Sequence, residues 1–413
     1  MLLDGVKTLD SFDPSGRKIL LRVDINSPVN RNTLKLEGAA KIEAATITAR
    51  ELLDRGAAVV MLAHQGRPGD YDFISLQSHC EAMKASMAGN LEFVQDICGQ
   101  QARSAIKRLE PGKALLLENV RQLDYEQKSG TAAEHSRTEL VTSLSPYFDY
   151  FINDAFAAIH RSHCSMVGFT ATLPSAAGRL MESELIHLSP LLDNPKKPAV
   201  YVFGGKKFGD FLPTLRSVAE SGKVDRVLLT GYLAISFLVA AGVRIDGATE
   251  SAVREEAGSV YFHDAAKLTG TGTKIVLPSD MGFDIGGNRV DMEIGEWPED
   301  GRALDIGART AGEYSRIISG AGTVFISGPP GVYEREQFAA GTRILFEAAT
   351  RPGIYSVIGG GHTSAAARKL GFDRKVSYLS TGGGALEALI TGKRIAVLDC
   401  LRDSAAKFRG RFR

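Results

Sequence analysis

The stretch "SVIGGGHTSAAARKLG" (residues 356–371) places an apolar run, three glycines and an alanine-rich segment in direct succession. The apolar run is typical of a buried β-strand, and the alanine-rich segment favours a helix. Glycine lets the backbone come close to a ligand, and a helix that begins just after it directs free N–H groups and its positive dipole end at an anion. The stretch therefore predicts a strand, a phosphate-binding loop and a helix, with an ordinary tight turn as the alternative.

Similar glycine-rich loops follow other apolar runs in the second half of the chain. They are "FGGKKFGD" (203–210), "LTGYLA" (229–234), "ISGPPGVYE" (326–334) and "LSTGGGALE" (379–387). Ligands of open parallel sheets gather at the carboxyl ends of the strands, so these loops are expected to share one edge. Several glycine loops at one edge favour phosphate binding over unrelated turns, and this half is predicted to bind a nucleotide.

Apolar, β-branched runs alternate with segments of helical period along the whole chain. The predicted strands are residues 17–23, 57–63, 113–119 and 148–154 in the first half, and 198–203, 226–230, 274–278, 322–327 and 354–359 in the second. Runs that are apolar on both faces indicate parallel sheets covered by helices. The prediction is an α/β fold of two doubly wound, Rossmann-like domains (residues 1–173 and 194–393), joined by a hinge and an inter-domain helix (174–193).

The strands of the first half end in basic side chains. "RVDINSP" brings Asp24 and Asn26, "AHQGRPGD" brings His64 and Arg67, "ENVRQL" brings Arg121, and "NDAFAAIHRSH" brings Asp154, His160, Arg161 and His163. A single arginine in such a loop is usually solvated, and Asp24 alone could be a turn residue. Because four strand ends converge by topology, the guanidinium groups are expected to bind one small, highly anionic substrate.

Composition excludes several classes of protein. The 413 residues carry a net charge of +1 and are 44% hydrophobic, which is typical of a globular protein of two or three domains rather than a nucleic-acid-binding protein. No apolar run is long enough for a bilayer, so a cytoplasmic protein without membrane contact is expected. A monomer is expected, although composition does not fix the oligomeric state. The four scattered cysteines predict buried thiols. The P-loop, the dinucleotide fingerprint and the protein-kinase signatures are absent from the sequence.

Seven motifs in chain order resemble those of phosphoglycerate kinase. They are "LRVDINSPV", "LAHQGRPGD", "LLLENVR", "INDAFAAIHRSH", "SGPPGVYE", "IGGGHTSAA" and "LSTGGGALE", and the phrases "INSP", "AHQGRP" and "GGGHT" are most similar to the archaeal branch of the family. The resemblance implies reversible phosphoryl transfer between 1,3-bisphosphoglycerate and ADP, giving 3-phosphoglycerate and ATP, with Mg²⁺ bound to the nucleotide. It also implies hinge closure, catalysis by charge stabilisation, and a final segment (394–413) that returns to the N-terminal domain.

The resemblance assigns roles to individual residues. The implied substrate ligands are Asp24, Asn26, Lys41, His64, Arg67, Arg121 and Arg161. The implied nucleotide site comprises Gly204, Gly205, Lys207, Glu334, Gly360, Gly361, His362, Thr363, Gly382 and Gly383. Lys41, Lys207 and Arg161 are the implied catalytic residues. The metal ligands stay unassigned, with Asp210 and Asp280 as two alternatives.

Five positions depart from the family pattern. They are Lys41 in place of an arginine, Phe211 in place of a lysine, Ser327 in place of an asparagine, Tyr232 within a double glycine, and His362 in place of an aspartate. Lost donors of this kind lower transition-state stabilisation. The open alternatives are a slower kinase, a kinase for a related acid, and a regulatory paralogue that binds phosphoglycerate or nucleotide without turnover. A dinucleotide-dependent oxidoreductase is a weaker alternative, because its fingerprint is missing.

Overall fold

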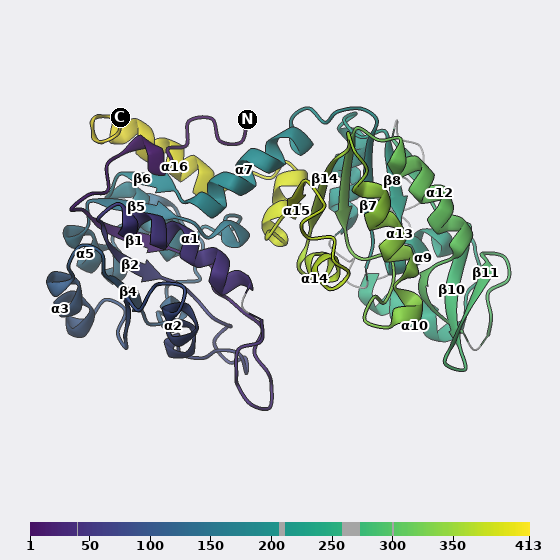
Figure 1. The fold of residues 1–413 in the computed structure, drawn as a ribbon, viewed down its shortest axis with the longest axis horizontal. Coiled ribbons are helices and arrows are strands. Elements are labelled where there is room, and N and C mark those ends of the chain that lie inside the picture. Colours follow the sequence, from purple (N-terminus) through teal and green to yellow (C-terminus); the bar gives the residue numbers. More distant parts are fainter. Residues whose placement is uncertain (39, 206–210, 258–272, 300) are drawn as a thin grey trace. The chain divides into compact units, whose positions relative to one another are not determined.

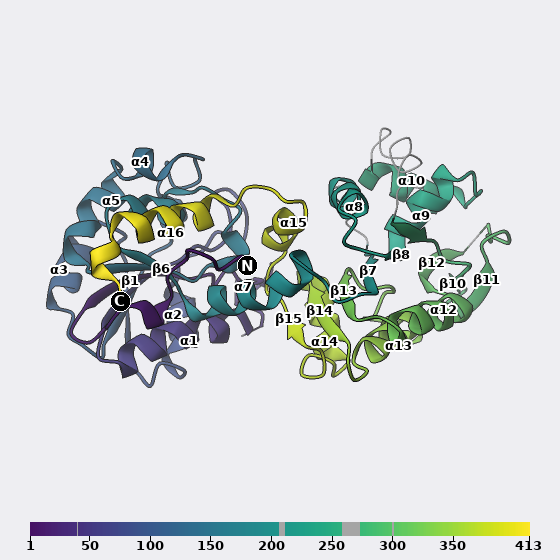
Figure 2. The same cartoon turned by 90° about the horizontal axis from the view of Figure 1, so that it is seen from above.

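The computed structural model describes residues 1–38, 40–205, 211–257, 273–299 and 301–413. It divides into two compact units (Figures 1 and 2): unit 1 comprises Met1–Ile186 with Arg394–Arg413, and unit 2 comprises His187–Lys393. Helix α7 (Arg179–Leu192) belongs to both. Within the described ranges, no helix combines the length and the apolar character that a membrane span requires.

Unit 1 is built on a six-stranded parallel sheet in the order β3-β4-β2-β1-β5-β6. The strands are β1 (Lys18–Arg22), β2 (Ala58–Leu62), β3 (Leu91–Val94), β4 (Ala114–Leu117), β5 (Tyr150–Asn153) and β6 (Ser175–Ala177). The side chains of β1 alternate between the two faces of the sheet. Ile19 and Leu21 pack in the core on one face, and Leu20 packs in the core on the other. Helices α1 (Ala40–Asp54) and α2 (Gln77–Lys84) cover the first face, and α3 (Gln100–Arg108) and α5 (Glu139–Leu144) cover the second.

Unit 2 contains a second six-stranded sheet, in the order β15-β14-β13-β7-β8-β9. Its strands are β7 (Ala199–Phe203), β8 (Arg226–Leu229), β9 (Lys274–Val276), β13 (Thr323–Ser327), β14 (Tyr355–Gly359) and β15 (Tyr378–Leu379), and all the pairings are parallel. One face carries α12 (Ala308–Ser319), α13 (Ala340–Ala349) and α14 (Gly361–Lys369). The other face carries α8 (Phe211–Glu220) and α15 (Gly384–Ile390). Helices α9 (Gly231–Ala240) and α10 (Gly247–Ala257) also belong to this unit.

These two parallel sheets confirm the predicted α/β class, but the sequence prediction missed a third sheet. Strands β10 (Asp280–Ile285), β11 (Asn288–Glu293) and β12 (Arg302–Ile306) form an antiparallel sheet in unit 2. The β10–β11 turn is Gly286-Gly287, and both residues have positive φ. A two-glycine turn between alternating strands is a recognised hairpin signal, so this sheet could have been found from the sequence.

The inter-domain helix begins later than predicted. Residues 175–177 form strand β6, which pairs with β5, and the helix starts at Arg179. Ser175 is fully buried, and its N–H donates to the hydroxyl of Ser404 on helix α16 (Ala396–Lys407). Sheet pairing and this tertiary contact therefore outweigh the helical period of the local sequence. The short strands β3 and β15 were also missed.

The C-terminal segment packs in unit 1. Helix α16 contacts β6, and the Tyr150 hydroxyl donates to the carbonyl of Arg411 at 2.8 Å. The ring of Tyr150 stacks on Phe12 at 4.2 Å and lies 6.1 Å from the ring of Phe412. The C-terminal segment therefore packs Phe412 against Tyr150 of the first sheet.

Candidate active site

The predicted substrate ligands of unit 1 follow the carboxyl ends of neighbouring parallel strands. Five of them form what we call the basic edge: Lys41, His64, Arg67, Arg121 and Arg161. Burial, followed by the charges of Arg161, Arg22 and Arg67, lowers the pKa of Arg121 to about 10. Burial and the neighbouring Arg67 lower the pKa of Arg161 in the same way. Several guanidinium groups thus repel one another at one place, which an anionic ligand would relieve.

Asp24 is the carboxylate at this edge, and it is 7% exposed. Its Oδ2 lies 3.2 Å from Lys41 Nζ, and its Oδ1 accepts from the Asn26 N–H at 3.0 Å. Burial by itself would raise the pKa of this carboxyl, but the Lys41 ammonium and the Asn26 N–H help to lower it to about 2. Asp24 is therefore ionised and orients Lys41, which stands near the start of α1.

We expect Asp24→Asn to lower the free energy of unfolding at pH 7 by about 2 kcal/mol. A carboxylate whose pKa is lowered on folding stabilises the protein above its unfolded pKa, and that contribution disappears as the pH falls through the folded value near 2. Urea unfolding followed by circular dichroism should show the difference shrinking from pH 7 towards pH 3. The exposed Asp13→Asn is the control, and a difference that grows on acidification would contradict the prediction.

Two predicted ligands also hold the loop that follows β2. Asn26 Oδ1 accepts from the Gly66 N–H at 3.0 Å, and an Nη1 proton of Arg121 is donated to the Gly66 carbonyl. These bonds fix the backbone next to Arg67. Both backbone polar groups of Gly66 are therefore bonded next to the residue that would contact a substrate.

Sequence reasoning missed Gln65, which joins three segments beneath the basic edge. Its Oε1 accepts from the Ser27 N–H at 2.9 Å, and its Nε2 donates to the Ser27 carbonyl at 3.0 Å. The His79 ring on α2 contacts the same Oε1 at 3.0 Å, so His79 is a core histidine. The signal available was the glutamine of "AHQGRP", placed between two predicted ligands.

Asp154 lies apart from the histidines near Arg161. Asp154 Oδ1 accepts from the Met181 N–H at the start of α7, and burial raises the pKa of this carboxyl to about 6. Asp154 therefore belongs to the helix start rather than to the ligand set. His160 stays at the basic edge, where its Nε2 accepts from Arg161 Nε at 3.1 Å. Burial and the nearby arginines lower the pKa of His163 to about 4.

In unit 2, glycine loops from β7 and β13 pack directly on one another. A Cβ at Gly328 would collide with the Gly204 carbonyl, and a Cβ at Gly204 would collide with the Thr230 hydroxyl. These glycines are therefore required by loop packing, whatever they bind. The ligand roles of Gly204 and Gly205 stay predictions.

The loops before α14 and α15 are more open. Gly360 adopts φ +91° as the N-cap of α14, and its N–H donates to the Gly382 carbonyl at 3.3 Å, which joins the two loops. A Cβ at Gly361 or Gly383 would meet nothing within 4 Å. Thr363 is buried, and its Oγ1 accepts from the Gly328 N–H at 2.7 Å. His362 and Glu334 are exposed at the same edge of the sheet.

Asp210 and Asp280 are the two residues that the sequence offers as metal ligands. Lys207 and Asp210 lie outside the described residues. Asp280 is wrong as a metal ligand, because its carboxylate accepts from the backbone of Arg309 and Thr310 and from the Thr310 hydroxyl at the start of α12. Across the described part of the chain, no three His, Cys, Asp or Glu side chains are grouped to hold a metal ion.

Phe211, one of the five departures from the family pattern, packs edge-on against Phe203 with 5.6 Å between ring centroids, so it is a core residue.

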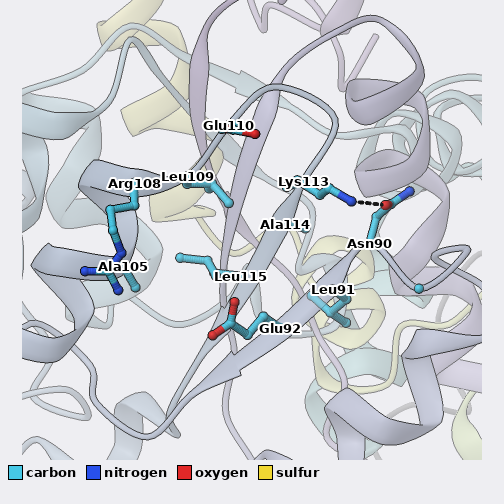
Figure 3. Close-up of a pocket in the computed structure, with 11 residues that line it drawn as sticks. Asn90, Leu91, Glu92, Ala105, Arg108, Leu109, Glu110, Lys113, Ala114 and Leu115 are labelled. Carbon is cyan, nitrogen blue, oxygen red and sulfur yellow. Dashed lines mark hydrogen bonds between the residues drawn. The ribbon is translucent and has the colours of Figure 1, made fainter.

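A surface hollow of about 380 Å³ lies elsewhere in unit 1 (Figure 3). Its lining includes Leu91 and Ala114, the first residues of β3 and β4, and the Lys113 ammonium that donates to Asn90 at 2.8 Å. It therefore lies towards the amino ends of the strands. No predicted ligand lines it.

Comparison with known proteins agrees with this arrangement. The family model described as phosphoglycerate kinase matches residues 9–393. This chain belongs to the phosphoglycerate kinase family. A phosphoglycerate kinase of Methanothermobacter thermautotrophicus is 40% identical over 399 residues, covering 96% of this chain and 97% of the relative. One from Archaeoglobus fulgidus is 39% identical over 409 residues, covering 98% and 99%.

Solved structures of phosphoglycerate kinases are also similar. The crystal structure from Pyrococcus horikoshii OT3 has a TM-score of 0.91 and 34% identity, covering 97% of this chain and 100% of that one. The structure from Coxiella burnetii has a TM-score of 0.78 and 29% identity, covering 96% and 99%. The archaeal relatives agree with the archaeal character of "INSP", "AHQGRP" and "GGGHT".

Proposed function

We propose that this phosphoglycerate kinase family member transfers a phosphoryl group reversibly between 1,3-bisphosphoglycerate and ADP, giving 3-phosphoglycerate and ATP. The observation that carries the proposal is the basic edge, where the charges of neighbouring guanidinium groups lower the pKa of the buried Arg121 and the half-buried Arg161. A substrate with a carboxyl and a phosphate group supplies the missing negative charge and accepts forked hydrogen bonds from arginine. The proposed ligands in unit 1 are Asp24, Asn26, Lys41, His64, Arg67, Arg121 and Arg161.

The proposed nucleotide site is at the carboxyl edge of the unit 2 sheet. The N-terminus of α14 and the open loop at Gly383 offer backbone N–H groups to phosphate oxygens. The proposed ligands are Gly204, Gly205, Lys207, Glu334, Gly360, Gly361, His362, Thr363, Gly382 and Gly383. Lys207 is included among these ligands only because it matches the family pattern, since it lies outside the described residues.

Magnesium enters the proposal as part of the nucleotide complex. Mg²⁺ commonly binds through substrate phosphates with one or two carboxylates, and it then neutralises phosphate charge. The donor set fits this arrangement, because the described residues at this edge include one exposed carboxylate, Glu334, beside the imidazole of His362, which is a poor magnesium ligand.

Phosphoryl transfer requires the protein mainly to position the two substrates and to stabilise negative charge. A phosphoryl group in transfer spreads negative charge over its oxygens, which fixed cations stabilise. Lys41, Lys207 and Arg161 are the proposed cations, and Asp24 keeps Lys41 in place. Because the two ligands bind to different units, transfer also requires the proposed closure about the hinge.

The alternative functions are less favoured. Family membership and the intact basic edge disfavour a binding-only paralogue, since drift to such a role would erode the substrate ligands. The same membership disfavours the oxidoreductase. Phe211 fills the core, so this departure follows from packing.

The test is transfer from Mg-ATP to 3-phosphoglycerate, with acyl phosphate formation followed by a coupled reductive assay. We expect turnover of about 1 per second or faster, the lower end of typical enzymes. Glycerate and 2-phosphoglycerate are the control acceptors, and we expect them to be poor. Binding of both ligands without turnover would favour the regulatory paralogue, and preference for another acid would replace the substrate.

We expect Lys41→Ala to lower kcat about a hundredfold, because one donor to the transition state is lost. Lys41→Arg should keep at least the original kcat, since guanidinium retains the charge and adds donors. Saturating both substrates separates kcat from KM. Lys35→Ala, at an exposed position in the preceding loop, is the matched control. An unchanged kcat in Lys41→Ala would remove Lys41 from the catalytic set.

A further inference from the structure

Arg22 is a buried arginine beneath the basic edge that none of the proposed roles uses. It is the last residue of β1 and is 2% exposed. Its Nε donates to the Ser165 hydroxyl at 2.9 Å, an Nη1 proton is donated to the Val23 carbonyl, and Nη2 lies 2.8 Å from His64 Nδ1. An arginine this deep needs both hydrogen-bond acceptors and a counter-charge.

Glu126 supplies the counter-charge through Ser165. Glu126 is 1% exposed, and its two oxygens accept from the Ser165 hydroxyl at 2.6 Å and the Ser165 N–H at 2.8 Å. The single hydroxyl proton of Ser165 goes to Glu126, so its oxygen lone pairs remain for Arg22. The order Glu126, Ser165, Arg22, His64 is therefore a continuous chain of hydrogen bonds with defined donors.

The direction of the last bond follows from chemistry. Arginine has donors and no acceptor, so His64 Nδ1 must accept and cannot carry a proton. A neutral imidazole has one N–H, which must then be on Nε2. Among the described residues, none accepts a hydrogen bond from His64 Nε2, and this N–H is available to a ligand.

We propose that Arg22, held by Ser165 and Glu126, is a positioning residue that fixes His64 as the neutral Nε2–H tautomer and aims one uncharged donor at an anionic oxygen of the acceptor substrate. The part of the inference that concerns the substrate rests on the proposed function. The tautomer itself depends only on the contacts of Arg22.

The surroundings of His64 favour the neutral ring. Burial and the Arg22 guanidinium lower the pKa of His64 well below its usual value, Arg121 and Arg161 act in the same direction, and Asp24 opposes them. A protonated ring would set a donor against the Arg22 donors and add a cation to the basic edge. The site therefore has, in the Nε2–H of His64, a hydrogen-bond donor whose charge does not change near neutral pH.

The first test is ¹⁵N NMR of the histidine-labelled full chain, with a His64→Gln spectrum used to assign the ring among the eight histidines. We expect the shift of unprotonated nitrogen at Nδ1, that of protonated nitrogen at Nε2, and no titration from pH 5.5 to 8.5. A Nδ1–H ring, or titration near the ordinary histidine pKa of about 6.5, would overturn the proposal.

The second test removes the buried charges together. The double variant Arg22→Met with Glu126→Gln leaves no unpaired buried charge, which protects the fold. We expect the His64 pKa to rise by about one unit or more, both tautomers to appear, and KM for 3-phosphoglycerate to rise about tenfold with a smaller change in kcat. Arg67→Lys, which alters a neighbouring cation without a bond to His64, should keep the Nε2–H ring.

A double variant that retains a single, non-titrating Nε2–H tautomer would overturn the role of Arg22. If the double variant fails to fold, Ser165→Ala breaks the same chain of hydrogen bonds at its centre and is read by the same NMR signals. The spectra do not depend on turnover. An enzyme that is inactive with 3-phosphoglycerate but has the expected His64 signals would refute the proposed function and leave the positioning role intact.

Discussion

Arg161→Ala is expected to lower kcat/KM for 3-phosphoglycerate by about a thousandfold, the upper range for loss of one transition-state donor. Arg161 stands at the basic edge, where its charge acts on Arg121, and its Nε donates to His160. Truncation removes a cation that we propose both binds the substrate and faces the developing charge. The coupled assay at varied 3-phosphoglycerate measures the effect.

Nucleotide affinity is the internal control for this variant. Isothermal titration with Mg-ADP should give a dissociation constant within about twofold of the original, because Arg161 belongs to unit 1 and the proposed nucleotide ligands belong to unit 2. Arg137→Ala, an exposed arginine of unit 1, should leave activity unchanged. Equal losses of substrate and nucleotide binding would count against the division of roles between the two units.

Gly328→Ala is expected to destabilise unit 2 by about 3 kcal/mol or more and to abolish activity at 37 °C. The new Cβ would collide with the Gly204 carbonyl, and backbone cannot yield as a flexible side chain can. The loop also accommodates the bond from the Gly328 N–H to Thr363, so a shift would disturb the start of α14. Urea unfolding followed by the fluorescence of Trp297, the single tryptophan, reports on this unit.

Gly353→Ala separates the collision from backbone strain. Gly353 has φ +87°, close to the +92° of Gly328, but a Cβ there would meet nothing within 4 Å. We therefore expect a loss of only about 1 kcal/mol, the cost of a left-handed alanine. Similar losses in the two variants would show that loop packing at Gly328 is unimportant.

The fold was largely predictable because its strongest signals are local. Strands such as β2 and β13 are apolar on both faces, and that pattern reports burial in a helix-covered parallel sheet without any knowledge of partners. The order of the motifs likewise placed the proposed ligands after predicted strands. Strand β6 was not predicted, because its three small residues are held extended by pairing with β5 and contact with α16.

The candidate site was predicted as a set of residues, but not as a set of bonds. The sequence by itself determined which side chains follow each strand, and parallel topology then requires these residues to share an edge. Only the tertiary structure decided which groups meet there. Arg22 contacts Ser165 across 143 positions of sequence, and Thr363 contacts Gly328 across 35. Such contacts depend on strand register and loop paths, which local composition does not encode, and they decide the tautomer of His64 and the need for glycine at position 328.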